Sequence, residues 1–200
     1  MAESRPIRLP AADFQARPLP VKILTGFKAL RVHGIPYPAV QFRLASSHRF
    51  SHPDAPGGLL YAGGDLETCL WECFGDSILD PGSRISRARW MNQRVSWIES
   101  SSSFRICDLT DTKVRSALKV DLSALKHTDL DVPQAWGLAI QTHPDEVDGL
   151  CYMSRFTGKQ CTVLFERSDL ALKLKSKTEG NLVDLDEGVQ FLSDNEIALV

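Results

Sequence analysis

The chain has 200 residues, a formal net charge of −2 and a hydrophobic fraction of 43%, which predict one globular domain with a real core. The near-neutral charge argues against direct nucleic-acid binding, because such proteins usually carry a basic excess. No segment has the length and apolarity of a membrane span, and the five cysteines lack the CxxC spacing of metal or redox sites. We therefore expect a soluble cytoplasmic protein with free thiols and no metal site.

The N-terminal third begins with an irregular segment. Residues 1–20 carry four prolines and little periodicity, so we expect an extended arm. The apolar stretch Lys22–Val32 fits either a short helix or the start of a strand, and its length leaves both interpretations open. Residues 30–33 are typical of a strand fragment, which Gly34 would close.

A strand followed by a helix is predicted over residues 59–75. The short apolar run Leu59–Ala62 lies between two glycine pairs, and Asp65 is suited to cap the following helix. The apolar stripe of that helix has helical spacing and comprises Leu66, Cys69, Leu70, Cys73 and Phe74. Gly75 is expected to end the helix. Glu72 lies off the stripe, so it need not enter the core.

The remaining elements alternate irregularly. Strands are predicted at residues 95–98, 104–109, 149–153 and 162–165, with 170–174 as a further candidate, and helices at 111–118 and 133–142. The basic run of Arg84, Arg87, Arg89 and Arg94 is expected to be a solvated loop. Because regular βαβ alternation is absent, we predict an α+β domain. Neither a GxGxxG fingerprint nor a GxxxxGK[ST] loop is present, which argues against Rossmann-type nucleotide binding.

Three segments together resemble one known family. They are RFSHPDAPGGLLYAGGDLETCLWE from Arg49 to Glu72, DGLCYMSR from Asp148 to Arg155, and ALRVHG around Arg31. Their order and spacing resemble the RES domain, a family named for its Arg, Glu and Ser and associated with destruction of NAD. The resemblance covers about residues 30–167. Val32 departs from the pattern, since an aromatic residue often follows the first arginine in relatives, and His33 or Tyr37 could substitute for it.

The resemblance implies a fold and a role. The implied fold is similar to ADP-ribosyltransferases, with a split mixed sheet and flanking helices around an NAD cleft. We place a catalytic domain at residues 21–175 and a packed acidic segment at 176–200. The implied role is cytoplasmic NAD degradation, without a prosthetic group, by hydrolysis or by phosphorolysis with inorganic phosphate as co-substrate. Such proteins are commonly toxins that a helix-turn-helix antitoxin blocks. The sequence leaves open whether the protein forms a homodimer.

The chemistry of NAD cleavage suggests roles for the matching residues. A carboxylate beside the ribose can stabilise an oxocarbenium-like transition state, which the resemblance assigns to Glu72. Arg31 and Arg49 are the candidate diphosphate clamps, with Arg43 as a rival to Arg49. Tyr61 and His33 would wall the substrate, and Ser154 would donate a hydrogen bond to a phosphate or to nicotinamide.

Other functions remain open at this point. Glu72 could be a solvated helix-face residue, the arginines ordinary surface residues and Ser154 a turn residue. An ADP-ribosyltransferase acting on a macromolecule would use the same cleft with a different acceptor. A non-catalytic binding module is the alternative from another class.

Overall fold

A single curved sheet organises the chain in the computed structural model, which describes residues 8–80, 82, 84–167 and 169–200. Eight strands form it in the order β1-β6-β7-β8-β3-β2-β5-β9. The pairing of β6 with β7 is parallel and the other pairings are antiparallel. The strands are β1 (Lys22–Leu24), β2 (Phe27–Gly34), β3 (Leu59–Gly63), β5 (Gln93–Ser100), β6 (Phe104–Asp108), β7 (Gly149–Met153), β8 (Gln160–Phe165) and β9 (Lys175–Asn181).

The sheet is split between β3 and β2. These two strands pair at one position in the described structure, Leu30 with Gly63. Each nevertheless pairs over its full length with its other neighbour, β3 with β8 and β2 with β5. The two halves of the sheet therefore diverge at this point, as expected for the split mixed sheet that the family resemblance implied.

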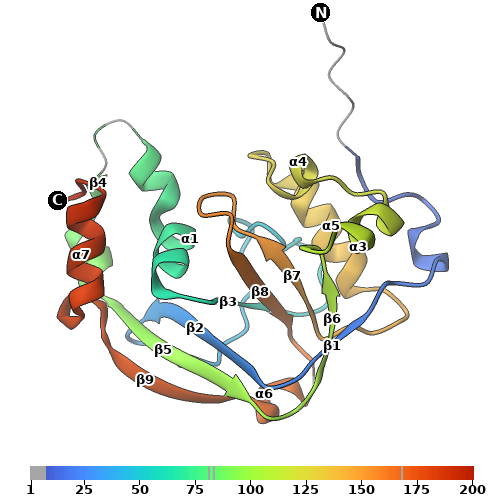
Figure 1. The fold of residues 1–200 in the computed structure, drawn as a ribbon, viewed down its shortest axis with the longest axis horizontal. Helices are drawn as coiled ribbons and strands as arrows, with labels where there is room; N and C mark the ends of the chain where they lie inside the picture. The colour runs from blue at the N-terminus through green and yellow to red at the C-terminus, as the bar shows by residue number, and fades with distance from the viewer. Residues whose placement is uncertain (1–7, 81, 83, 168) are drawn as a thin grey trace, which may run out of the picture.

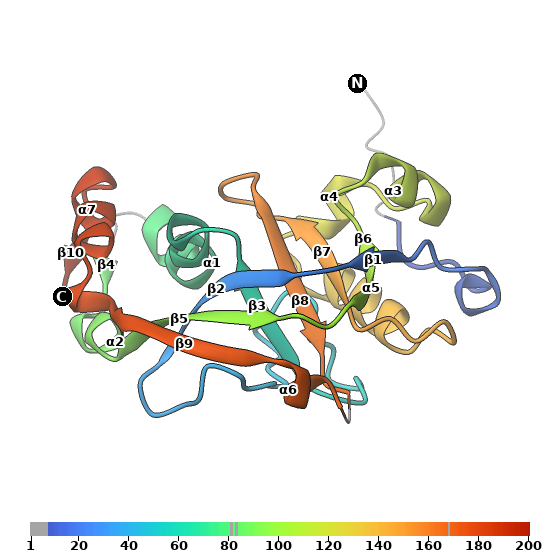
Figure 2. The same ribbon diagram turned by 60° about the horizontal axis from the view of Figure 1, so that its bottom comes forward.

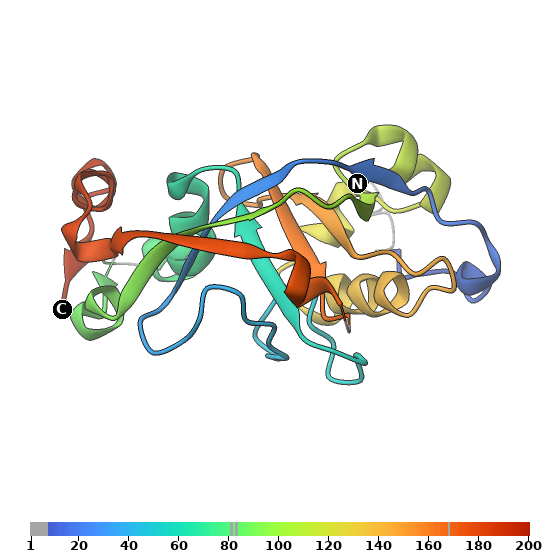
Figure 3. The same ribbon diagram turned by 90° about the horizontal axis from the view of Figure 1, so that it is seen from below.

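Helices flank the sheet in two groups (Figure 1). In that view α1 and α7 stand over one end of the sheet, and α3, α4 and α5 stand over the other. Figure 2 shows β2, β5 and β9 running side by side, and Figure 3 shows β9 along the underside with α6 at its start. The helices are α1 (Leu66–Leu79), α2 (Arg87–Met91), α3 (Thr112–Leu118), α4 (Leu122–Leu125), α5 (Asp131–Gln141), α6 (Leu170–Lys173) and α7 (Asp186–Asp194).

Helix α1 forms largely as its sequence predicts, but it is longer. The Asp65 carboxylate accepts a hydrogen bond from the Thr68 N–H at 2.8 Å, which confirms the predicted N-cap. The prediction that Gly75 ends the helix is wrong, because α1 continues to Leu79. Gly75 instead permits close packing, since a Cβ there would lie 2.5 Å from the ring of Phe156.

Three other predictions are corrected or resolved by the structure. Lys22–Val32 contains two strands, β1 and β2, and no helix. The candidate strand at residues 170–174 is the short helix α6 followed by its C-cap Leu174, and Leu170 and Leu174 are both buried at a spacing of four. The basic run is not a loop. Arg84 lies in the two-residue strand β4 (Arg84–Ile85), Arg87 and Arg89 lie in α2, and Arg94 lies in β5. The buried Trp90 holds α2 to the core.

The described residues at both ends of the chain pack against the domain. Phe14 is buried and meets Trp136 edge-on at 5.6 Å, and the Trp136 indole N–H donates to the carbonyl of Arg8. The first seven residues of the predicted arm lie outside the described range. At the other end, β9 extends the sheet beside β5, Leu182 and Phe191 are buried, and β10 (Ala198–Leu199) pairs with β4.

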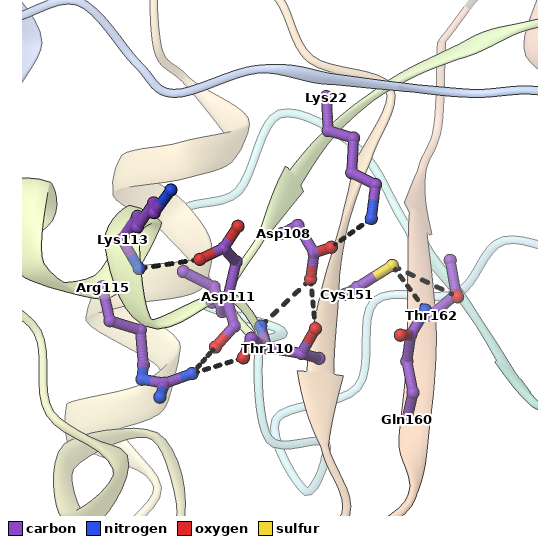
Figure 4. Close-up of polar contacts among 10 residues, drawn as sticks. Lys22, Asp108, Thr110, Asp111, Lys113, Arg115, Cys151, Gln160 and Thr162 are labelled. Atoms are coloured by element: carbon purple, nitrogen blue, oxygen red, sulfur yellow. Dashed lines mark hydrogen bonds and ion pairs between the residues drawn. The ribbon is translucent and has the colours of Figure 1, made fainter.

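A polar cluster ties β1 to the sheet through β6 (Figure 4). The buried Asp108 carboxylate accepts hydrogen bonds from Lys22 Nζ at 2.8 Å and from the Thr110 N–H at 3.1 Å and hydroxyl at 2.5 Å. Burial acts to raise the pKa of Asp108, but the Lys22 and Thr110 bonds together lower it below its ordinary value. Asp108 thus stabilises the fold in its ionised form.

We expect Asp108→Asn to lower the free energy of unfolding by about 1–3 kcal/mol at neutral pH. The lowered pKa in the folded state means that this stabilisation is present above the pKa of the unfolded carboxyl and is lost as pH falls through the folded value. Urea titrations should therefore show the difference from wild type shrinking below about pH 4. Asp13→Asn, which breaks an exposed ion pair with Arg17, is the control and should change stability little. A difference that stays constant with pH would contradict this explanation.

Candidate active site

A cavity of about 720 Å³ opens where the two halves of the sheet diverge. This volume lies in the range of small-molecule and cofactor sites. Its walls come from β2, β3, α1, α2, the β7–β8 hairpin and the segments 43–49 and 128–130. The polar residues that line it are Arg31, Arg43, Ser47, His48, Arg49, Tyr61, Glu72, Asp76, Ser77, Arg89, Gln93, Thr128, Tyr152 and Arg155.

Glu72 is held in place by two neutral hydroxyl groups. The Tyr152 hydroxyl donates to Oε2 at 2.7 Å, and the Ser154 hydroxyl donates to Oε1 at 2.6 Å. Burial raises the pKa of Tyr152 well above its ordinary value, and the Glu72 charge acts in the same direction, so the phenol remains a donor. Because each carboxylate oxygen can accept more than one hydrogen bond, Glu72 keeps acceptor capacity for a ligand.

Ser154 is fully buried and is absent from the cavity lining. Its oxygen also accepts from the N–H groups of Phe156 at 3.2 Å and Thr157 at 3.3 Å, which order the turn after β7. The sequence suggested that Ser154 donates directly to substrate. In this structure its hydroxyl is committed to Glu72, which makes Ser154 a positioning residue.

Five arginines and two carboxylates line the cavity. Arg155 forms an ion pair with Asp76, and it alone of the five is ion-paired among the described residues. Three others are anchored by backbone carbonyls. Arg31 Nη1 donates to Gln41 at 2.9 Å, Arg49 Nη1 donates to Leu125 and His127, and Arg89 Nη2 donates to Cys73. Carbonyl contacts fix these guanidinium groups without neutralising them, so the cavity is suited to an anionic ligand.

The predicted Glu and Arg residues are brought together. Burial lowers the pKa of Arg49, nearby Arg155 acts in the same direction, and the Glu72 carboxylate opposes them. Burial also lowers the pKa of Arg31 to about 10, and Arg43 contributes in the same sense. Both groups remain charged at neutral pH, and a bound anion would relieve the unfavourable burial of their charge.

The cavity wall that carries His48 and Arg49 is rigidly fixed. Gln134 of α5 donates to the carbonyls of Ser46 at 2.7 Å and His48 at 2.9 Å. The wall also packs closely on α5 at Gly137, where a Cβ would lie 2.2 Å from the carbonyl oxygen of Phe50. These contacts hold the segment against the helix before any ligand arrives.

Tyr61 and His33 occupy different positions. Tyr61 lines the cavity, its hydroxyl accepts the Phe50 N–H at 3.0 Å, and its ring meets His48 edge-on at 5.3 Å. His33 is buried outside the cavity lining. Its Nδ1 lies 3.0 Å from the Tyr37 carbonyl and its Nε2 lies 3.0 Å from Ser96 Oγ, so the fold uses both ring nitrogens. The structure therefore gives His33 a structural position, not the substrate-binding position predicted for it.

Sequence reasoning missed His48, Asp76 and Arg89 as cavity residues. Arg89 was placed in a solvated loop, whereas α2 turns it over the ring of Phe74, with Cζ 4.8 Å from the ring centroid. Asp76 follows Glu72 by one helical turn, so its shared helix face could have indicated it. His48 directly precedes Arg49, but nothing in the local pattern showed that its ring would pack on Tyr61.

Other site classes lack support in the described structure. No group of three or more His, Cys, Asp and Glu side chains that could hold a metal ion occurs among the described residues. Burial is the main cause that raises the pKa values of all five thiols, which disfavours reactive thiolates. No helix among the described residues is both long and apolar enough to cross a bilayer.

The split mixed sheet with flanking helices around a cavity is an ADP-ribosyltransferase-like fold. One solved structure supports this class: the M. tuberculosis MbcT-MbcA toxin-antitoxin complex matches with a TM-score of 0.58 at 15% identity, over 86% of this chain and 90% of that chain. The chain belongs to the RES domain family, whose model matches residues 28–185. The "Probable toxin y4kH" of Sinorhizobium fredii is 30% identical over 105 residues, which span 52% of this chain and 80% of that protein.

Proposed function

We propose that the protein degrades NAD by cleaving the bond between nicotinamide and ribose. The observation that carries the proposal is a carboxylate held by two neutral donors inside a cavity where four of five arginines lack an acidic partner among the described residues. Such a site offers negative charge at one point and unpaired guanidinium groups around it. NAD presents the complement, with a cationic pyridinium ribose joined to a diphosphate.

The proposed reaction needs little acid assistance, because the leaving group is a pyridinium that departs as neutral nicotinamide. The bond between C1′ and the ring nitrogen breaks, and its electron pair stays with nicotinamide. Glu72 stabilises the positive charge that develops on the ribose. Arg31 and Arg49 hold the diphosphate, Tyr61 walls the substrate, and Tyr152 and Ser154 keep Glu72 oriented. Water or inorganic phosphate then forms the new bond at C1′.

We further propose that the protein acts as a cytoplasmic toxin controlled by an antitoxin. Two likenesses support this assignment: the Sinorhizobium relative is named a probable toxin, and the matching solved structure is a toxin-antitoxin complex. A helix-turn-helix antitoxin that covers the cavity would prevent NAD from entering. Transfer of ADP-ribose to a macromolecule is the second candidate, because it would use the same cavity with a different acceptor.

The test is incubation of the purified protein with NAD while free nicotinamide is measured over a range of phosphate concentrations. We expect nicotinamide release. A rate that rises with phosphate indicates phosphorolysis, and a rate that does not indicates hydrolysis. NAD labelled in its adenine would mark an added macromolecule if ADP-ribose is transferred. Absence of nicotinamide release under all these conditions would refute the proposed function.

A further inference from the structure

His48 lines the cavity, and the described structure leaves one of its ring nitrogens without a hydrogen-bond partner. Its Nδ1 is buried and has no hydrogen-bond partner among the described residues. The two buried histidines among the described residues, His33 and His143, differ from the half-buried His48 in this respect. His33 uses both nitrogens as described above, and His143 places Nε2 at 3.0 Å from the Arg17 carbonyl and accepts the Asp145 N–H at Nδ1. Because a buried polar atom without a partner is costly, the free nitrogen of His48 suggests a partner that arrives with the ligand.

The position of His48 is fixed, because contacts hold both its backbone and its ring. Gln134 fixes its carbonyl, and the His48 N–H donates to the Ala45 carbonyl at 2.8 Å. The ring packs edge-on against Tyr61 with an interplanar angle of 77°. The Tyr61 hydroxyl accepts the Phe50 N–H, and the Phe50 ring packs edge-on at 4.9 Å against Tyr152, whose hydroxyl donates to Glu72. These contacts place the His48–Tyr61 pair on the Glu72 side of the cavity.

The surroundings also decide the charge state of the imidazole. Burial lowers the pKa of His48, and Arg43 and Arg31 lower it further, so the ring is neutral at pH 7. A neutral ring is a poor phosphate ligand beside several arginines. It is well suited to an uncharged group, for which it offers one donor and one acceptor.

We infer that His48 contacts the ligand directly and hydrogen-bonds an uncharged polar group in the nicotinamide half of the dinucleotide. That group is either the carboxamide or a hydroxyl of the adjoining ribose. The inference rests on the proposed function for the identity of the ligand. His48 thereby selects the nicotinamide end for the Glu72 side of the cavity, and the arginines receive the diphosphate.

The test measures NAD affinity by calorimetry in a Glu72→Gln background, which slows turnover. His48→Phe keeps a ring against Tyr61 and removes both nitrogens, so the Kd should rise about tenfold. His48→Gln restores a donor and an acceptor and should recover part of the affinity. Thermal unfolding of each variant checks that the cavity wall remains folded. Equal Kd values for the background protein and the His48→Phe variant would overturn the inference.

Ligand analogues identify the contacted group. The tenfold difference in Kd between the background protein and the His48→Phe variant should disappear for one of three analogues. These are a dinucleotide with pyridine in place of nicotinamide and two dinucleotides whose nicotinamide ribose lacks its 2′ or its 3′ hydroxyl. A factor that persists with all three analogues would overturn the inference. Wild-type protein that binds NAD without releasing nicotinamide would refute the proposed function and leave the His48 test intact. Failure of the wild type to bind NAD would refute both.

Discussion

Glu72→Gln is expected to reduce the rate of nicotinamide release by about 10²–10³-fold. The substitution keeps the size of the side chain but removes the negative charge that would stabilise the ribose cation. The effect should fall on kcat more than on KM, because the charge develops in the transition state and not in the bound substrate. Steady-state kinetics with NAD measure both parameters.

The fold should survive this change. The Tyr152 and Ser154 hydroxyls lose a charged acceptor, but one of them can still donate to the amide oxygen while the other rotates to accept from the amide N–H. We expect a loss of about 1–2 kcal/mol in the free energy of unfolding. Glu67→Gln is the matched control, since Glu67 lies exposed on the same helix and pairs with Lys159 at 2.7 Å. If Glu72→Gln retains activity within a few-fold of wild type while Glu67→Gln behaves similarly, Glu72 is not the stabilising carboxylate.

Arg31→Lys is expected to raise KM for NAD by about 10–100-fold, equivalent to roughly 1.4–2.7 kcal/mol of binding free energy. The guanidinium group of Arg31 spends one N–H on the Gln41 carbonyl and keeps the others for a phosphate. A lysine ammonium is a point donor on a different stem, so it cannot reproduce both contacts in the same geometry. The loss should appear mainly in KM, because the diphosphate is bound equally in the ground and transition states.

Arg87→Lys provides the control for Arg31→Lys. Arg87 is exposed on α2 and does not line the cavity, so its substitution should leave KM unchanged. Unfolding curves of both variants would show whether a change in KM comes from weaker NAD binding or from a less stable fold. An Arg31→Lys variant with a wild-type KM would remove Arg31 from the proposed diphosphate clamp.

Most helices and strands were predicted from the sequence because their signals lie in residues that are neighbours along the chain. The Asp65 cap, the apolar stripe of α1 and the apolar run of β7 each depend on neighbouring residues alone. The strand predicted at residues 170–174 is wrong because five residues with alternating leucines fit a strand and a helical turn equally well. The prediction that Gly75 ends its helix is wrong for a different reason. Gly75 permits close packing with Phe156, which is distant in sequence and approaches only in the folded chain.

The candidate site was predicted in part. Arg31, Arg49, Tyr61 and Glu72 line one cavity, as the resemblance implied. The hydrogen bonds that orient Glu72 could not be read from the sequence, because Tyr152 and Ser154 reach it across 80 and 82 residues of chain. His33 was misplaced because strand alternation puts it on the same face of β2 as Arg31, whereas its ring nitrogens contact Tyr37 and Ser96 outside the cavity lining. Arg89 and His48 depend in the same way on tertiary packing.

The most direct test of the central claim is a crystal structure of the Glu72→Gln protein with NAD bound. We predict that the nicotinamide ribose lies within hydrogen-bond distance of residue 72 and that the diphosphate contacts Arg31 and Arg49. NAD bound outside the cavity, or bound with its diphosphate beside residue 72, would contradict the proposed mechanism.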